Sequence, residues 1–171
     1  PYTTLFRSAH PPTNFALRKI CKINWVYCAS RDYFARCGIP QRLEDLEQQD
    51  CLINPNVSDN WRYQNVNGSF SALKVKSIIE VNSTLGLLHA ALHHQGIVSL
   101  PTYMLGDSIA RGELVPVLTE YSTRENDYSL YALYHPGHYQ DPKVRSFIDF
   151  LVESIGENPD WDRWMQSPGE A

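Results

Sequence analysis

Residues 78–101, IIEVNSTLGLLHAALHHQGIVSLP, form the stretch that most restricts the fold. It opens with four residues rich in Ile and Val, which are typical of a strand. Asn82, Ser83 and Thr84 are residue types that cap helices, and the run of Leu and Ala behind them is helical in character. A glycine then ends the helix, and a short apolar run closed by a proline predicts a second strand. The predicted elements are a strand at 78–81, a helix from 82 to about 95 and a strand at 97–100.

The flanking sequence continues this alternation of strands and helices. Asn67 and Gly68 form a strong turn signal between two short strand patterns, so we expect a β-hairpin there. Such an alternation predicts an α/β domain with a largely parallel sheet. The other predicted strands are 22–29, 51–53, 61–63, 70–75, 114–118 and 128–134, and the other predicted helices are 31–37, 43–49 and 103–111.

The last helix has the clearest signals in the chain. Asp141 is a good N-cap, Pro142 suits the first helical position, and Gly156 suits the end. Beyond Gly156 the sequence is polar and contains a proline, with two tryptophans that could still pack. The apolar positions of the helix recur at helical spacing and predict one continuous buried stripe of Val144, Phe147, Ile148, Leu151, Val152 and Ile155.

Composition excludes several classes of protein. The 171 residues are 43% hydrophobic and 20% charged, which favours a globular core over disorder. The net charge is −4, and no cluster of Lys and Arg is large enough to neutralise DNA phosphates. No apolar run reaches the ~20 residues of a membrane span, and the start has no signal peptide. The four cysteines have no zinc-ligand spacing, so we expect reduced thiols in a cytoplasmic protein.

Several short motifs, in this order, resemble the effector-binding domain of LysR-type transcriptional regulators of the CrgA-like subgroup. The resemblance covers residues 14–155, and no single motif carries it alone. Two positions depart from the family pattern, because His94 and Ser77 stand where glycine is common. The matching motifs are Tyr27-Cys28-Ala29-Ser30, Tyr33-Phe34-Ala35, Gly38-Ile39-Pro40, Leu43-Glu44-Asp45-Leu46, Cys51-Leu52, Trp61-Arg62-Tyr63, Gly96-Ile97-Val98-Ser99-Leu100-Pro101, Gly112 to Leu118, and Val144 to Leu151.

The resemblance implies an α/β fold of the periplasmic-binding-protein-like (type 2) kind, with two lobes. The second lobe would be complete (about 26–118), and the first would keep only its closing part (about 128–156). We expect residues 9–156 to form this partial domain, ahead of a polar tail at 157–171. Residues 1–8, PYTTLFRS, resemble a translated sequencing adaptor and are expected to be an artefact, although a genuine unstructured terminus stays open.

Two helix N-termini are expected to face the ligand cleft between the lobes, one after Ser30 and one after Asn82. Their unpaired N–H groups and helix dipoles suit a carboxylate. Ser30, Asn82, Ser83 and Thr84 are therefore the candidate effector-binding residues. The alternative stays open that all four are ordinary helix caps that serve their own helices.

His89 and His93 stand four residues apart, as two zinc ligands on one helix face would. A third ligand is not evident, so we expect solvent-exposed histidines, no metal and no cofactor. For catalysis, the sequence has neither a Gly-x-Ser-x-Gly elbow nor a phosphate loop, and no motif supplies a base for Cys28. We therefore do not expect an enzyme.

The leading hypothesis is the small-molecule sensing domain of a transcription regulator. A small, anionic effector would bind between the lobes and change the geometry of a homodimer or homotetramer. DNA would be bound only through an N-terminal winged helix-turn-helix that this fragment lacks. A solute-binding protein that delivers its ligand to a transporter is the alternative, and the upstream genomic sequence would distinguish the two.

Overall fold

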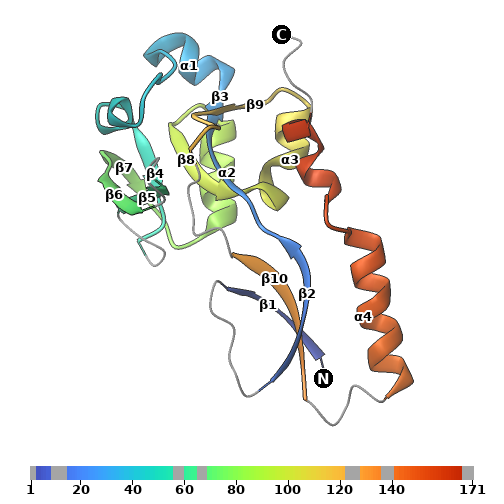
Figure 1. The fold of residues 1–171 in the computed structure, drawn as a ribbon. Coiled ribbons are helices and arrows are strands. Elements are labelled where there is room, and N and C mark those ends of the chain that lie inside the picture. The colour runs from blue at the N-terminus through green and yellow to red at the C-terminus, as the bar shows by residue number, and fades with distance from the viewer. Residues whose placement is uncertain are drawn as a thin grey trace. The chain divides into compact units, whose positions relative to one another are not determined.

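The protein is described by a computed structural model, which covers residues 3–8, 15–55, 60–64, 69–121, 128–135 and 141–166. The chain divides into two compact units (Figure 1). Unit 2 is the continuous stretch Asn24–Glu125, and unit 1 combines Pro1–Ile23 with Asn126–Ala171. Unit 2 is thus inserted within the chain of unit 1. The lobe boundaries expected from the sequence, about 26–118 and 128–156, stay a prediction.

Unit 2 is built on a five-stranded sheet with the order β7-β4-β8-β3-β9. Strand β4 pairs in parallel with β7 and β8, whereas β3 is antiparallel to both β8 and β9. Four strands therefore share one direction, and β3 runs against them. The strands are β3 (Trp25–Ser30), β4 (Cys51–Ile53), β7 (Ser77–Glu80), β8 (Ile97–Pro101) and β9 (Leu114–Val117).

Within unit 2 the expectation of a largely parallel sheet is correct except for β3, whereas the sheet of unit 1, which holds the predicted strand at 128–134, is antiparallel. The connection after β3 explains its direction. Helix α1 (Arg31–Cys37) has only 7 residues and is followed by the 3-10 helix η1 (Leu43–Glu47). These short pieces start β4 at the edge where β3 ends, so the chain does not cross back over the sheet. We call this the amino edge. The opposite edge, where β4, β7, β8 and β9 end and β3 begins, is the carboxyl edge.

Helix α2 (Thr84–Leu92) connects the two edges, since it starts after β7 and ends before β8. It ends three residues before the predicted end at 95, because His94 has a left-handed backbone with φ of 63°. Helix α3 (Thr102–Ala110) then leads from β8 to β9. Both helices appear in green to yellow beside β8 in Figure 1.

The core of unit 2 lies around Tyr27 and Leu46, both of which are fully buried. A hairpin of β5 (Asn60–Gln64) and β6 (Phe70–Lys74) adds to it, because Trp61 stacks on Tyr27 with 5.1 Å between ring centroids. The hairpin was predicted, but its predicted turn at Asn67 and Gly68 lies outside the described residues.

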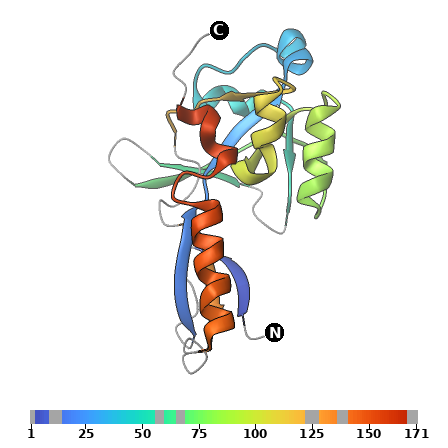
Figure 2. The same cartoon turned by 90° about the vertical axis from the view of Figure 1, so that its right-hand side faces the viewer.

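Unit 1 contains an antiparallel sheet with the order β1-β10-β2. Its strands are β1 (Thr3–Ser8), β2 (Ala16–Lys22) and β10 (Ser129–Tyr134), and Figure 2 shows α4 (Pro142–Ile155) running alongside the sheet. The prediction of a single strand over 22–29 is wrong, since β2 ends at Lys22 and β3 begins at Trp25. The break falls where the chain passes from unit 1 to unit 2. Strand β1 lies within the octapeptide 1–8, whose origin as an artefact stays a prediction.

Helix α4 has the predicted bounds and caps. The Asp141 carboxylate accepts the N–H of Lys143 at 2.9 Å, and Gly156 has φ of 68°. Val144 and Ile148 are buried against Ile20 and Ala132 of the sheet. Phe147, which we expected in the buried stripe, is 49% exposed. A short 3-10 helix, η3 (Asp160–Gln166), follows α4.

Candidate ligand-binding site

The four candidate effector-binding residues lie at two opposite edges of the unit 2 sheet. Asn82, Ser83 and Thr84 are at the N-terminal end of α2, at the carboxyl edge. Ser30 ends β3 at the amino edge, where it contacts His94 just beyond the C-terminal end of α2. At 1.5 Å per residue, the 9 residues of α2 separate the two groups by roughly 13 Å. One small ligand within unit 2 would not touch both groups.

At the carboxyl edge, the beginning of α2 is open to solvent. The Ser83 hydroxyl accepts the N–H of Gly86 at 3.2 Å, which is an ordinary helix cap. Asn82 and Ser83 are exposed, Thr84 is half-buried, and the first turn contains no acidic residue. The dipole and the remaining N–H groups of this turn are therefore not compensated by a carboxylate of the helix itself.

The same edge is tied together by Thr102. Its backbone N–H and its hydroxyl both donate to the carbonyl oxygen of Asn24, at 2.9 and 3.2 Å. This contact joins the end of β8 to the residue that leads into β3. Thr102 is fully buried, so both of its donors are satisfied away from water.

At the amino edge, Ser30 contacts two other residues. Its Oγ accepts the N–H of Tyr33 at 3.2 Å and lies 2.8 Å from Nδ1 of His94. The other ring nitrogen of His94, Nε2, is 3.4 Å from the Asp32 carboxylate. The histidine ring thus joins the start of α1 to the end of α2, and Ser30 itself is only 2% exposed.

A pocket of about 460 Å³ opens beside these residues. It is lined by residues 30–32 from the start of α1, by His89 and residues 92–94 from the end of α2, and by residues 112–113 before β9. Sequence reasoning identified Ser30 and the histidines but not the pocket that they share. The only local sequence signal for this pocket was His94, which stands where the family pattern favours glycine.

The carboxylates at this pocket both lie beside cationic or titratable partners. Arg111 holds Glu113 by two hydrogen bonds, of 3.0 and 2.9 Å, and these lower the pKa of the Glu113 carboxyl below its usual range. Asp32 faces His94. Arg31 differs, because its guanidinium has no ion-pair partner among the described residues. It lies across Gly112, where a Cβ would stand 3.3 Å from Nη2 of Arg31.

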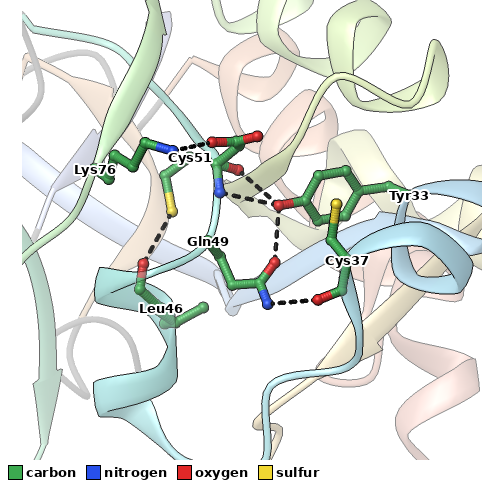
Figure 3. Close-up of polar contacts among 7 residues, drawn as sticks. Tyr33, Cys37, Leu46, Gln49, Cys51 and Lys76 are labelled. Carbon is green, nitrogen blue, oxygen red and sulfur yellow. Dashed lines mark hydrogen bonds and ion pairs between the residues drawn. The ribbon is translucent and has the colours of Figure 1, made fainter.

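Beneath α1, a hydrogen-bonded cluster ties the helix to β4 (Figure 3). The Tyr33 hydroxyl donates to Oε1 of Gln49 at 2.8 Å and accepts the N–H of Asp50 at 2.9 Å. Gln49 in turn donates to the carbonyl of Cys37, and the Asp50 carboxylate pairs with Lys76 at 2.7 Å. Burial raises the pKa of the Tyr33 hydroxyl above its usual range, so this residue acts as a neutral structural group.

The cysteines do not form a redox or metal site in the described structure. All four are free, and only Cys37 is exposed. Burial raises the pKa of the Cys21 thiol to about 11 and that of the Cys51 thiol to about 12. Among the residues that the structure describes, no group of three or more His, Cys, Asp or Glu side chains could hold a metal ion. None of the helices in these ranges is long and apolar enough to cross a membrane.

Comparisons with known proteins agree with this architecture. The family model described as the LysR substrate binding domain matches residues 4–156. The transcriptional regulator CrgA of Neisseria meningitidis serogroup B is 31% identical over 132 residues, which are 76% of this chain and 43% of the relative. DmlR of Escherichia coli strain K12 is 29% identical over 85% of this chain and 47% of its own length. The chain therefore spans less than half the length of these curated relatives.

Solved structures give the same result. The regulatory domain of CrgA from Neisseria meningitidis superposes with a TM-score of 0.75 at 27% identity, covering 90% of this chain and 75% of that one. The Vibrio cholerae virulence activator AphB gives a TM-score of 0.75 at 25% identity, covering 88% of this chain and 51% of that one. The predicted α/β, periplasmic-binding-protein-like fold is confirmed. The chain belongs to the LysR substrate-binding domain family.

Proposed function

We propose that this chain is the sensing part of a LysR-type transcription regulator and binds a small, anionic effector at the carboxyl edge of unit 2. The observation that carries the proposal is the open start of α2, where Asn82 and Ser83 are exposed and no acid occupies the first turn. A helix start of this kind attracts a carboxylate through its N–H groups and its dipole. Asn82, Ser83 and Thr84 would orient the ligand through amide and hydroxyl groups.

The alternative role of Ser30 as an effector contact has less support. Its hydroxyl is occupied by the Tyr33 N–H and the His94 ring, and its side chain is buried. The same facts argue against catalysis by a Ser30–His94–Asp32 arrangement, since a nucleophile must reach its substrate. We therefore propose a binding function and no enzymatic one.

At the level of the whole regulator, DNA would be contacted by a helix-turn-helix domain outside this chain. Curated relatives are named as HTH-type regulators, and the net charge of −4 here does not suit a phosphate-binding surface. Effector binding would change the geometry of a homodimer or homotetramer in the cytoplasm. The solute-binding alternative has no comparable support, because CrgA, PtxR and DmlR, three of the similar curated proteins, are named as transcriptional regulators.

The experiment is a thermal-shift screen of small mono- and dicarboxylates on the chain, followed by substitutions at Ser83. Ser83→Thr keeps a hydroxyl cap and should keep the response to a carboxylate that stabilises the wild type. Ser83→Asp also caps the helix but adds a negative charge, so it should preserve stability and abolish that response. Equal binding by Ser83→Asp, or no stabilisation by any carboxylate, would overturn the proposal.

A further inference from the structure

We infer that the pocket at the amino edge of unit 2 is a second ligand site, which takes a small organic molecule bearing one carboxylate or phosphate group. This site is separate from the effector site proposed above, because α2 lies between them. The pocket measures about 460 Å³, within the range of small-molecule sites. The inference does not depend on the effector proposal, since it uses different residues at the other end of the helix.

The charge balance of the pocket favours an anion. Glu113 is held by Arg111, and Asp32 faces His94, so both carboxylates are already engaged. The guanidinium of Arg31 has no such partner within the described residues. Arginine presents paired N–H groups that match the geometry of a carboxylate or a phosphate. Arg31 is therefore the expected anchor of the ligand.

The backbone around Arg31 leaves room for this contact. Gly112 has φ of 68° and lies beneath the guanidinium, where a Cβ would stand 3.3 Å from Nη2. Glycine thus allows both the turn and the close approach of the Arg31 side chain. Leu92, which is half-buried, gives the pocket an apolar wall, so the ligand would carry an organic portion next to its charged group.

The histidines add hydrogen-bond donors to the site. His89 and His93 line the same pocket and have no side-chain partner among the described residues, whereas His94 already faces Asp32. A ring N–H of either histidine can donate to an oxygen of a bound anion. The charged and polar groups near the pocket are Arg31, Asp32 and Arg36 from α1, the three histidines of α2 and its end, Asp107 from α3, and Arg111 and Glu113 before β9.

Sulfate is the probe, because it is a dianion whose oxygens accept hydrogen bonds from arginine and histidine side chains. Sodium sulfate would be titrated into the isotope-labelled chain, and NMR would record the chemical shifts of the backbone amides and histidine rings. A parallel titration with sodium chloride at equal ionic strength is the control for non-specific salt effects. We expect saturable chemical-shift changes at Arg31, His89, His93 and Gly112.

Arg31→Gln should weaken sulfate binding by about tenfold or more, as expected for one charge-assisted contact. The matched control is Arg18→Gln, which removes the same charge from an exposed residue of β2 in unit 1 and should leave binding unchanged. Equal weakening by both arginine variants, shifts that do not saturate, or shifts found only outside this pocket would overturn the inference. Loss of both the carboxylate stabilisation and the sulfate shifts in Ser83→Asp would also overturn it.

Discussion

Nδ1 of His94 lies 2.8 Å from Oγ of Ser30, although the two residues are 64 positions apart in the chain. The contact joins the end of α2 to the start of α1. It also accounts for a histidine in a left-handed conformation that usually favours glycine, since the ring gains two polar partners there. The side chain thus offsets part of the backbone strain.

His94→Ala should therefore be more destabilising than His94→Gly. Alanine loses the contacts to Ser30 and Asp32 and keeps the unfavourable backbone, whereas glycine loses the contacts but relieves the strain. We expect the glycine variant to have a free energy of unfolding about 1 kcal/mol higher than the alanine variant. Urea denaturation followed by circular dichroism measures the difference, and identical midpoints would contradict this account.

Ser30→Ala should cost more stability than Ser83→Ala. Both serines cap a helix, with the same 3.2 Å distance to the N–H they accept. Ser30 is buried and also contacts His94, whereas Ser83 is exposed and has no second side-chain partner among the described residues. We expect about 2 kcal/mol for Ser30→Ala and about 1 kcal/mol or less for Ser83→Ala. Chemical denaturation of both variants under one set of conditions tests the order.

Gly96→Ala should strongly destabilise unit 2, and Gly86→Ala should not. A Cβ at Gly96 would lie 2.4 Å from the backbone carbonyl oxygen of Asp50, which cannot move without displacing β4. At Gly86 the nearest atom would be 3.4 Å away, and the position is inside α2, where alanine is favoured by up to about 1 kcal/mol. Thermal melts should show a large fall for Gly96→Ala and an unchanged or higher midpoint for Gly86→Ala. Equal effects would show that the close approach is not rigid.

Stability should decline in alkali because of the buried thiols. Burial raises the pKa of the Cys51 thiol from 9.0 to about 12, so the fold favours the neutral form. The contribution is complete below pH 9.0, and it is lost as the pH rises from there toward 12, since only the unfolded chain then releases the proton. Each such thiol adds a slope of about 1.4 kcal/mol per pH unit in that window.

Cys51→Ala should make this slope shallower, whatever its effect on stability at pH 7. Cys37→Ala is the matched control for removing a thiol, since Cys37 is exposed, and it should change the slope less than Cys51→Ala does. The free energy of unfolding, measured in urea at several values between pH 8 and pH 11, gives both slopes. A Cys51→Ala slope equal to that of the wild type would rule out this assignment.

Local signals in the sequence account for much of the fold. Asp141, Pro142 and Gly156 defined α4 because capping and the limits on proline and glycine depend only on neighbouring residues. The direction of β3 could not be read in the same way. It depends on how the chain travels through α1 and η1, and strand periodicity is the same in either direction. The break between β2 and β3 was missed because Ile23, which lies between the two strands, continues the apolar pattern of Trp25, Val26 and Tyr27.

For the candidate site, too, the sequence indicated the features that depend on neighbouring residues but not those that depend on sheet topology. Ser83 was recognisable as a cap from its sequence neighbours, and it does cap α2. Ser30 was also recognised as a cap, but its placement at the edge opposite Asn82 follows from sheet topology. The pocket with Arg31 is lined by three segments that are distant in sequence, and no local sequence pattern indicates that they lie close together in space.

The insertion of unit 2 within unit 1 has a consequence for folding order. Strand β2 pairs with β10 across an intervening stretch of about a hundred residues, and closing an unfolded loop of that length costs about 4 kcal/mol in chain entropy. In the folded unit 2, β3 and β9 are neighbours, with Tyr27 opposite Val117, so the two ends of the insertion are held together. A folded unit 2 thus replaces a long loop by a short one. The sheet of unit 1 should therefore assemble after its insert, as a late and reversible closing step.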